Sequence, residues 1–134
     1  MKTLFELQND LPFDTALSER LQKTASAMLQ SARQGQYTQA LILVSSTEKE
    51  YRAVIKDALS KEMTEEKALL EELKANQDTA LDYILCMWQD GGIDIPSMAF
   101  RKLLCSMDPQ NADAHLFVMT KNGVSVVKLA NTLK

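Results

Sequence analysis

The segment from Gln77 to Trp88, QDTALDYILCMW, decides the fold that we predict for this chain. One stripe of apolar side chains recurs at spacings of three and four residues: Leu81, Ile84, Leu85 and Trp88. A second stripe covers much of the opposite side: Ala80, Tyr83 and Met87. A helix that is apolar nearly all round is usually buried, and this segment is too short to span a bilayer. We therefore predict a central helix, capped by Asp78, against which the other elements pack.

Length and composition predict a single globular domain, residues 1–134. The chain is 46% hydrophobic and 25% charged, which is ordinary for a globular protein, and 134 residues can bury a substantial core. We find no apolar run that would serve as a signal peptide or a membrane span, so we expect a cytoplasmic protein. The two cysteines, Cys86 and Cys105, are compatible with free thiols or with a disulfide.

Capping signals and helical spacing predict further helices, at residues 4–10, 14–34, 47–61, from 64 onward, and 97–107. The 47–61 helix opens on Thr47-x-x-Glu50, which fits a capping box. The run Tyr37–Val44 predicts a short buried strand, although its spacing also fits one helical hairpin of a tetratricopeptide.

The C-terminal part predicts a β-hairpin. Leu116–Thr120 and Val124–Leu129 flank Asn122-Gly123, a strong hairpin signal, and a two-residue turn there places Thr120 opposite Ser125. One face of the hairpin has the apolar composition of a protein core. The other face contains Phe117, Met119 and Val126, and we expect it either to be covered by a helix or to bind a partner. The predicted fold class is α+β, with five or six helices packed against a small sheet made of one central strand and this hairpin.

The charge distribution predicts a protein-binding surface. Residues 62–94 contain nine acidic and two basic side chains, a net charge of −7, which argues against a nucleic-acid partner and favours a basic protein. We expect five carboxylates to form the partner-binding surface: Glu62, Glu65, Glu66, Asp90 and Asp94.

Catalytic and metal motifs are weak in this sequence. His115 is the only histidine and has no second ligand at metal-binding spacing, and Asp90-Gly91-Gly92-Ile93-Asp94 has too few ligands for a calcium loop. We therefore expect no cofactor, no metal, no catalytic residue and no enzymatic activity, and we expect neither nucleic acid nor membrane as a partner.

Three functional hypotheses follow from these patterns. The first is a small acidic inhibitor, comparable to an immunity protein that masks a basic nuclease toxin. The second is a structural or regulatory module that self-associates, either through the hairpin face or by pairing of the hairpin's edge strand with a second copy. The third is an enzyme with an unrecognised site, which requires a pocket joining His115 to Asp82, Asp90 or Asp94.

Overall fold

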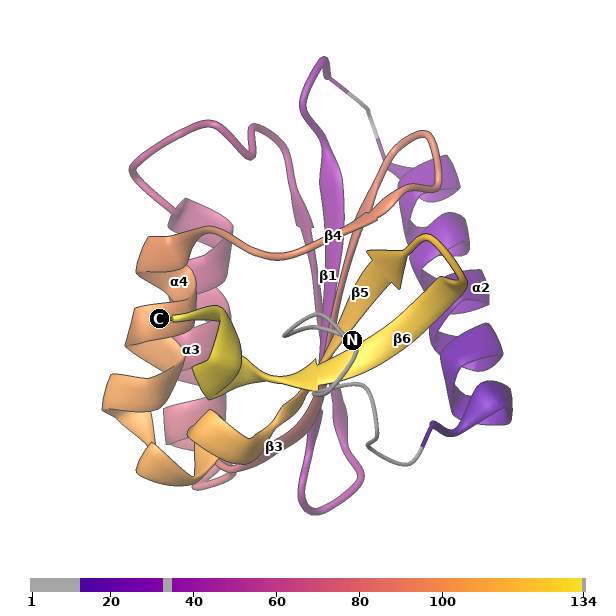
Figure 1. Ribbon diagram of the computed structural model, residues 1–134. Helices are drawn as coiled ribbons and strands as arrows, with labels where there is room; N and C mark the ends of the chain where they lie inside the picture. The colour runs from indigo at the N-terminus through magenta and orange to yellow at the C-terminus, as the bar shows by residue number, and fades with distance from the viewer. Residues whose placement is uncertain (1–12, 33–34, 134) are drawn as a thin grey trace.

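A six-stranded mixed sheet forms the centre of the computed structural model, which describes residues 13–32 and 35–133 (Figure 1). The strands are β1 (Gln39–Ser45), β2 (Glu50–Ile55), β3 (Leu81–Trp88), β4 (Ile93–Asp94), β5 (His115–Thr120) and β6 (Gly123–Lys128). Their order is β2-β1-β3-β5-β6, and the short β4 pairs with β3 beside this path. The β3–β5 pair is parallel and the other pairs are antiparallel.

Helices cover both faces of the sheet, so the described residues form three layers (Figure 1). Helix α2 (Thr15–Ser31) lies on one face, and α3 (Thr64–Ala75) and α4 (Met98–Met107) lie together on the other. Two short 3-10 helices, η1 (Pro109–Asp113) and η2 (Leu129–Thr132), precede β5 and follow β6. None of the helices in the described residues has the length and apolarity needed to cross a bilayer.

The predicted fold class is wrong. The described residues contain three α-helices and a six-stranded sheet, rather than five or six helices on a small sheet. The helix expected at residues 4–10 lies outside the described residues. The two remaining differences are residues 77–88 and 47–61, which contain the strands β3 and β2 where helices are predicted.

The expected central helix is the central strand β3, which pairs with β1, β4 and β5. Its side chains alternate between the two cores: Ile84 and Cys86 face α3 and α4, whereas Leu85 and Met87 face α2. A strand that is buried on both faces is apolar at consecutive positions, as a buried helix also is. The apolar residues of this segment therefore fit helical spacing by coincidence, and the segment follows the two-residue period of a strand.

The expected helix 47–61 is the β1–β2 turn followed by β2. Thr47 does not cap a helix, because its hydroxyl donates a 2.8 Å hydrogen bond to Oδ2 of Asp78. Glu48 has a φ of 66°, in the left-handed region that a tight turn uses. Glu50 then pairs with Val44 across the hairpin.

Several local predictions are confirmed. The strand expected near Leu41–Val44 is β1, which is buried along its whole length. Asp14 caps α2 by accepting a 2.9 Å hydrogen bond from the Leu17 amide, and Ser97 caps α4. The helix expected from residue 64 onward is α3, in which Leu69, Leu70 and Leu73 are buried.

The C-terminal hairpin is also present, but its register differs from the prediction by two residues. Thr120 lies opposite Gly123, and Val118 lies opposite Ser125, so the turn is Lys121-Asn122. A slip of two residues keeps every side chain on its expected face, because side chains in a strand alternate with a period of two.

The second hairpin face is not free to bind another copy of the chain. Phe117 and Val126 are each 1% exposed and belong to the core beneath α2. Only Met119, at 54% exposure, lies open at the surface on that face. The hairpin face expected to pair with a second copy is therefore covered within the described chain, whereas β6 remains an edge strand of the sheet.

Asn111 joins η1 to the sheet and to α4. Its Oδ1 accepts a 2.8 Å hydrogen bond from the Leu81 amide, and its Nδ2 donates to the carbonyls of Thr79 and Leu104 at 3.0 and 2.9 Å. The side chain is fully buried. It thereby fixes the start of β3 against η1, where a cavity opens.

Candidate functional site

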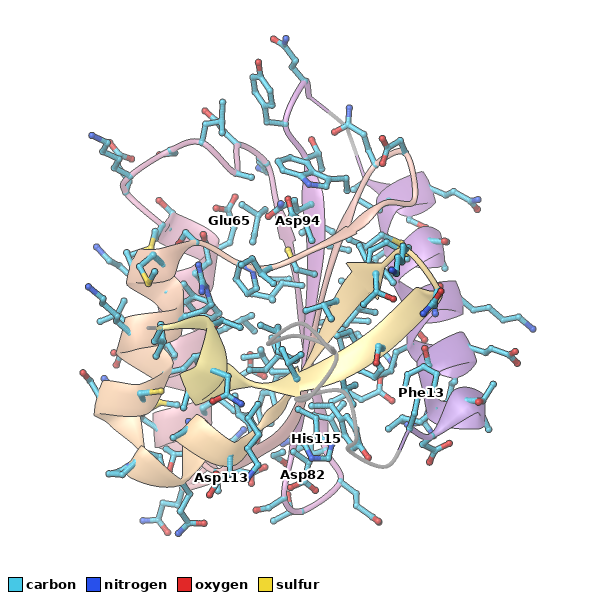
Figure 2. The ribbon with its side chains drawn as sticks, in the orientation of Figure 1. Phe13, Glu65, Asp82, Asp94, Asp113 and His115 are labelled. Carbon is cyan, nitrogen blue, oxygen red and sulfur yellow. The ribbon has the colours of Figure 1, made fainter. Side chains whose placement is uncertain are left out.

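A cavity of about 340 Å³ lies where the parallel strands β3 and β5 begin. It is lined by residues from the β1–β2 turn, the start of β3, η1 and the start of β5: Ser46, Ala80, Leu81, Asp82, Tyr83, Gln110, Asp113 and His115. Figure 2 shows Asp82, Asp113 and His115 near one another at this end of the molecule. The third hypothesis required a pocket that joins His115 to an aspartate, and Asp82 meets that condition whereas Asp90 and Asp94 do not line the cavity.

His115 enters the cavity because β5 pairs with β3 in parallel, with His115 opposite Tyr83. The two rings meet edge to face, with centroids 5.5 Å apart and an interplanar angle of 85°. The Nδ1 atom of His115 is buried and finds no hydrogen-bond partner among the described residues.

Tyr83 and two carboxylates supply the other polar groups of the cavity. Burial raises the pKa of the Tyr83 phenol, and the negative charges of Asp14 and Asp82 raise it further, so the phenol stays protonated and able to donate. Tyr83 also stacks on Phe117, with centroids 5.7 Å apart, which holds the ring in place. Asp113 lies 3.6 Å from Nζ of Lys128, while Asp82 is exposed at the cavity.

Of the five carboxylates expected to form a partner-binding surface, one is buried and the others are exposed or partly exposed. Glu62 is exposed, but Glu66 is only 6% exposed and cannot contribute to a surface. Asp90 accepts a hydrogen bond from the Gly92 amide, and Asp94 accepts one from Nε1 of Trp88 at 2.9 Å. Glu65 accepts from the Lys56 amide at 3.2 Å and, in Figure 2, lies toward the same end of the molecule as Asp94.

Glu66 is a buried carboxyl with an unsatisfied oxygen. Its Oε1 atom has no hydrogen-bond partner among the described residues. Burial raises the pKa of this carboxyl, a hydrogen bond from its own backbone amide opposes the rise, and the charge of Glu65 adds to it. Cys86 lies in the same core, and burial followed by the charges of Asp94 and Glu66 raises the pKa of its thiol well above the usual range.

The starts of α3 and α4 lie against each other at the opposite end of the sheet from His115. The Ser97 hydroxyl donates to Sδ of Met63 at 3.7 Å and accepts a 3.2 Å hydrogen bond from the Phe100 amide. Met63 precedes α3 with φ 51° and ψ 46°, a left-handed conformation that is uncommon for a residue with a side chain. Phe100, one turn into α4, is fully buried.

Comparison with known proteins identifies the fold. No protein-family model matches the sequence, and no curated protein matches it either. Among solved structures, the cytidine deaminase of Mycobacterium leprae is similar with a TM-score of 0.61 and 21% identity, over 87% of this chain and 96% of that chain. The cytidine deaminase of Mycobacterium tuberculosis has a TM-score of 0.61 and 13% identity, over 87% and 93% of the two chains. Likeness at this identity establishes a cytidine deaminase-like fold.

This fold corrects the functional predictions. The expectations of an acidic inhibitor, of an immunity-type protein, of a basic protein partner and of a chain without enzymatic activity are wrong, because the fold is that of enzymes named as cytidine deaminases. These predictions fail for a physical reason: a net negative charge within a stretch of sequence does not require its carboxylates to lie on one surface.

The residues at the paired helix starts do not fit the metal that this fold family implies. Zinc-dependent nucleobase deaminases bind zinc through an H-x-E motif and a P-C-x-x-C motif, in which His and two Cys are the ligands. This chain has the same spacings in Met63-Thr64-Glu65 and in Pro96-Ser97-Met98-Ala99-Phe100, with the glutamate and the proline present. The three ligand positions carry a thioether, a hydroxyl and a phenyl ring, which are not the thiolate, imidazole and carboxylate ligands of zinc. Within residues 13–32 and 35–133, no three His, Cys, Asp or Glu side chains cluster so as to hold a metal ion.

Sequence reasoning missed the partners of His115. It treated His115 as an ordinary residue at the edge of a strand, because no partner lies near it in the sequence. The signal that could have found the cavity is the parallel pairing of β3 with β5, which becomes visible only once 77–88 is read as a strand.

Proposed function

We propose that this protein binds a small molecule bearing an amino-substituted nucleobase, in the cavity where β3 and β5 begin. The observation that carries this proposal is the combination, in one cavity, of two aromatic rings and two carboxylates. The proposal concerns the ligand class, and it is independent of the metal chemistry used by zinc deaminases.

The cavity suits a nucleobase in size and in chemistry. Small-molecule pockets begin at roughly 300 Å³, and this cavity measures about 340 Å³. Bases stack on aromatic side chains, for which Tyr83 and His115 supply rings. A carboxylate accepts hydrogen bonds from an exocyclic amino group, as acidic residues do from cytosine N4, and Asp82 is placed to do so.

The similar solved structures are enzymes named for cytidine, which motivates the choice of a nucleobase as the ligand to test. The positions that match the deaminase metal motifs lie at the other end of the sheet, so the case for this cavity rests on its own lining residues. His115 is the group in this cavity best suited to transfer a proton, because histidine is the commonest general acid or base in enzymes. We therefore include chemical conversion of the ligand, with release of ammonia, among the activities to be measured.

We also propose a cytoplasmic location. Cys86 and Cys105 are both free thiols, which is usual in a reducing compartment.

Nuclear magnetic resonance titration of the native protein with cytidine, adenosine and uridine tests the proposal. We expect amide shifts to change at Ser46, Asp82 and His115 with cytidine or adenosine, and to change less with uridine, which lacks the amino group. Asp82→Asn should weaken binding at least about tenfold, because it removes a charged acceptor worth roughly 1.5–3 kcal/mol. Ammonia release is measured on the same samples.

The matched control is Asp90→Asn, which changes an exposed aspartate in the β3–β4 turn, away from the cavity, while an Asn oxygen can still accept from the Gly92 amide. It should leave binding unchanged. The proposal fails if no nucleoside binds, if Asp90→Asn and Asp82→Asn weaken binding equally, or if the shifts map to the starts of α3 and α4.

A further inference from the structure

We propose that the junction of α3 and α4 is a deaminase-type metal centre in which all three ligand positions have been filled by side chains that pack instead of binding metal. In this centre Met63, Ser97 and Phe100 replace the ligands, so the chain keeps the layout of a zinc site without the ability to bind zinc. This inference does not depend on the His115 cavity.

The first argument is the distance between two of the ligand positions. In a tetrahedral zinc site with Zn–S bonds near 2.3 Å, two thiolate sulfurs lie about 3.8 Å apart. The Sδ atom of Met63 and the Oγ atom of Ser97 lie 3.7 Å apart, although they come from different helices. These two side-chain atoms are therefore at the separation that two ligands of one zinc ion have.

The second argument is the backbone at Met63. Its left-handed conformation has a φ of 51°, which is uncommon and costs energy in a residue with a Cβ atom. Helix α3 gains no side-chain cap from this arrangement, since Met63 makes no capping hydrogen bond. The conformation does place the Met63 side chain against the start of α4.

The third argument is how the remaining space is used. Phe100 is fully buried in the same core as Cys86, and Met63 packs against that core. The Ser97 hydroxyl is engaged by the Phe100 amide and by Met63. Arg101, the next residue, is 6% exposed and holds the loop by donating to the carbonyls of Pro96 and Thr132 at 2.8 and 2.7 Å. The site is thus consolidated by packing and hydrogen bonds among its own residues.

Zinc binding by the native protein and by the triple variant Met63→Cys/Ser97→Cys/Phe100→Cys tests this inference. We expect the native protein to retain no stoichiometric zinc after equilibration and gel filtration. The triple variant should retain one zinc per chain, and its cobalt complex should show the visible absorption of a tetrahedral thiolate site. Stoichiometric zinc in the native protein would overturn the inference.

The matched control moves the three cysteines to exposed neighbouring positions on the same helices, as Thr64→Cys/Met98→Cys/Ala99→Cys. This variant has the same number of added thiols and should bind zinc at least tenfold more weakly than the first triple variant. Equal zinc affinities of the two triple variants would show that the positions carry no special geometry, and would overturn the inference.

The double variant Met63→Cys/Ser97→Cys guards against unfolding, because it leaves the buried Phe100 in place. It should bind zinc more weakly than the triple variant but at least tenfold more tightly than the native protein. If the folded double variant binds no better than the native protein, the two positions do not share a metal geometry and the inference is wrong.

Discussion

The Tyr51 hydroxyl donates a 2.9 Å hydrogen bond to Oδ2 of Asp78 and so connects β2 with the segment that leads into β3. Asp78 is only 7% exposed, and the same oxygen accepts a 2.8 Å hydrogen bond from Thr47. Burial alone would raise the pKa of this carboxyl, but hydrogen bonds from Ser45, Thr47 and Tyr51 lower it below the usual range. The Asp78 carboxylate is thus ionised, and hydrogen bonds from protein hydroxyls stabilise its charge.

Tyr51→Phe should lower the free energy of unfolding at neutral pH by about 1.5–3 kcal/mol, because it removes a hydrogen bond to a charged group. A carboxyl whose pKa is lower in the folded state stabilises the fold above its unfolded pKa, and that contribution is lost as the pH falls through the folded pKa. The difference between the variant and the native protein should therefore shrink in acid. Urea denaturation at a series of pH values measures it.

The control for this prediction is Tyr37→Phe, since Tyr37 is 39% exposed and should change the free energy of unfolding by less than about 0.5 kcal/mol. A loss of stability in Tyr51→Phe that stays constant from neutral to acidic pH would contradict the role assigned to Asp78.

Glu66→Gln should raise the free energy of unfolding at neutral pH by an amount on the order of 1 kcal/mol, because the native carboxylate is buried with one oxygen unsatisfied. Burial raises the pKa of Glu66, so its favourable contribution is fully present below the unfolded pKa and is lost as the pH rises through the folded pKa. The stabilisation by Gln should therefore disappear in acid. Thermal unfolding at several pH values measures the stability difference between Glu66→Gln and the native protein. Glu62→Gln is the control, because Glu62 is exposed. The prediction is refuted if Glu66→Gln is less stable than the native protein at neutral pH.

The two thiols should react with a disulfide reagent at very different rates in the native protein. Cys86 is fully buried in β3 and its pKa is raised by burial and nearby carboxylates, whereas Cys105 on α4 is partly exposed. We expect one thiol per chain to react under native conditions and the second only on unfolding. Cys105→Ser should abolish the native reaction, and rapid reaction of Cys86 in that variant would show that β3 is more open than described.

The sequence predicts those elements in which local signals and tertiary packing agree. Helices α2 and α4 have a capping residue, Asp14 and Ser97, followed by an apolar face of helical period. β1 was recognised from its run of β-type residues, and the last two strands from the turn signal beside them. The strand β3 was lost because Leu81, Ile84, Leu85 and Trp88 fit helical spacing while the residues between them are apolar as well.

The candidate sites depend on pairing that one sequence does not display. His115 and Tyr83 are neighbours only because two strands far apart in the chain run parallel. Met63 and Ser97 meet only because α3 and α4 begin side by side on one face of the sheet. The net charge of a sequence segment identifies neither of these two sites, because it does not show which carboxyls are exposed. Glu66, for example, is expected at a surface but is buried.

The strand order also dictates a sequence of assembly during synthesis. By the time Trp88 is made, β2, β1 and β3 can be fully paired, with α2 and α3 available to cover opposite faces. The free edge of β3 then has backbone groups that await β4 and β5, which are made later. An unpaired central edge is a template for association between chains, so β4 and β5 protect a nascent copy against aggregation once they pair with β3.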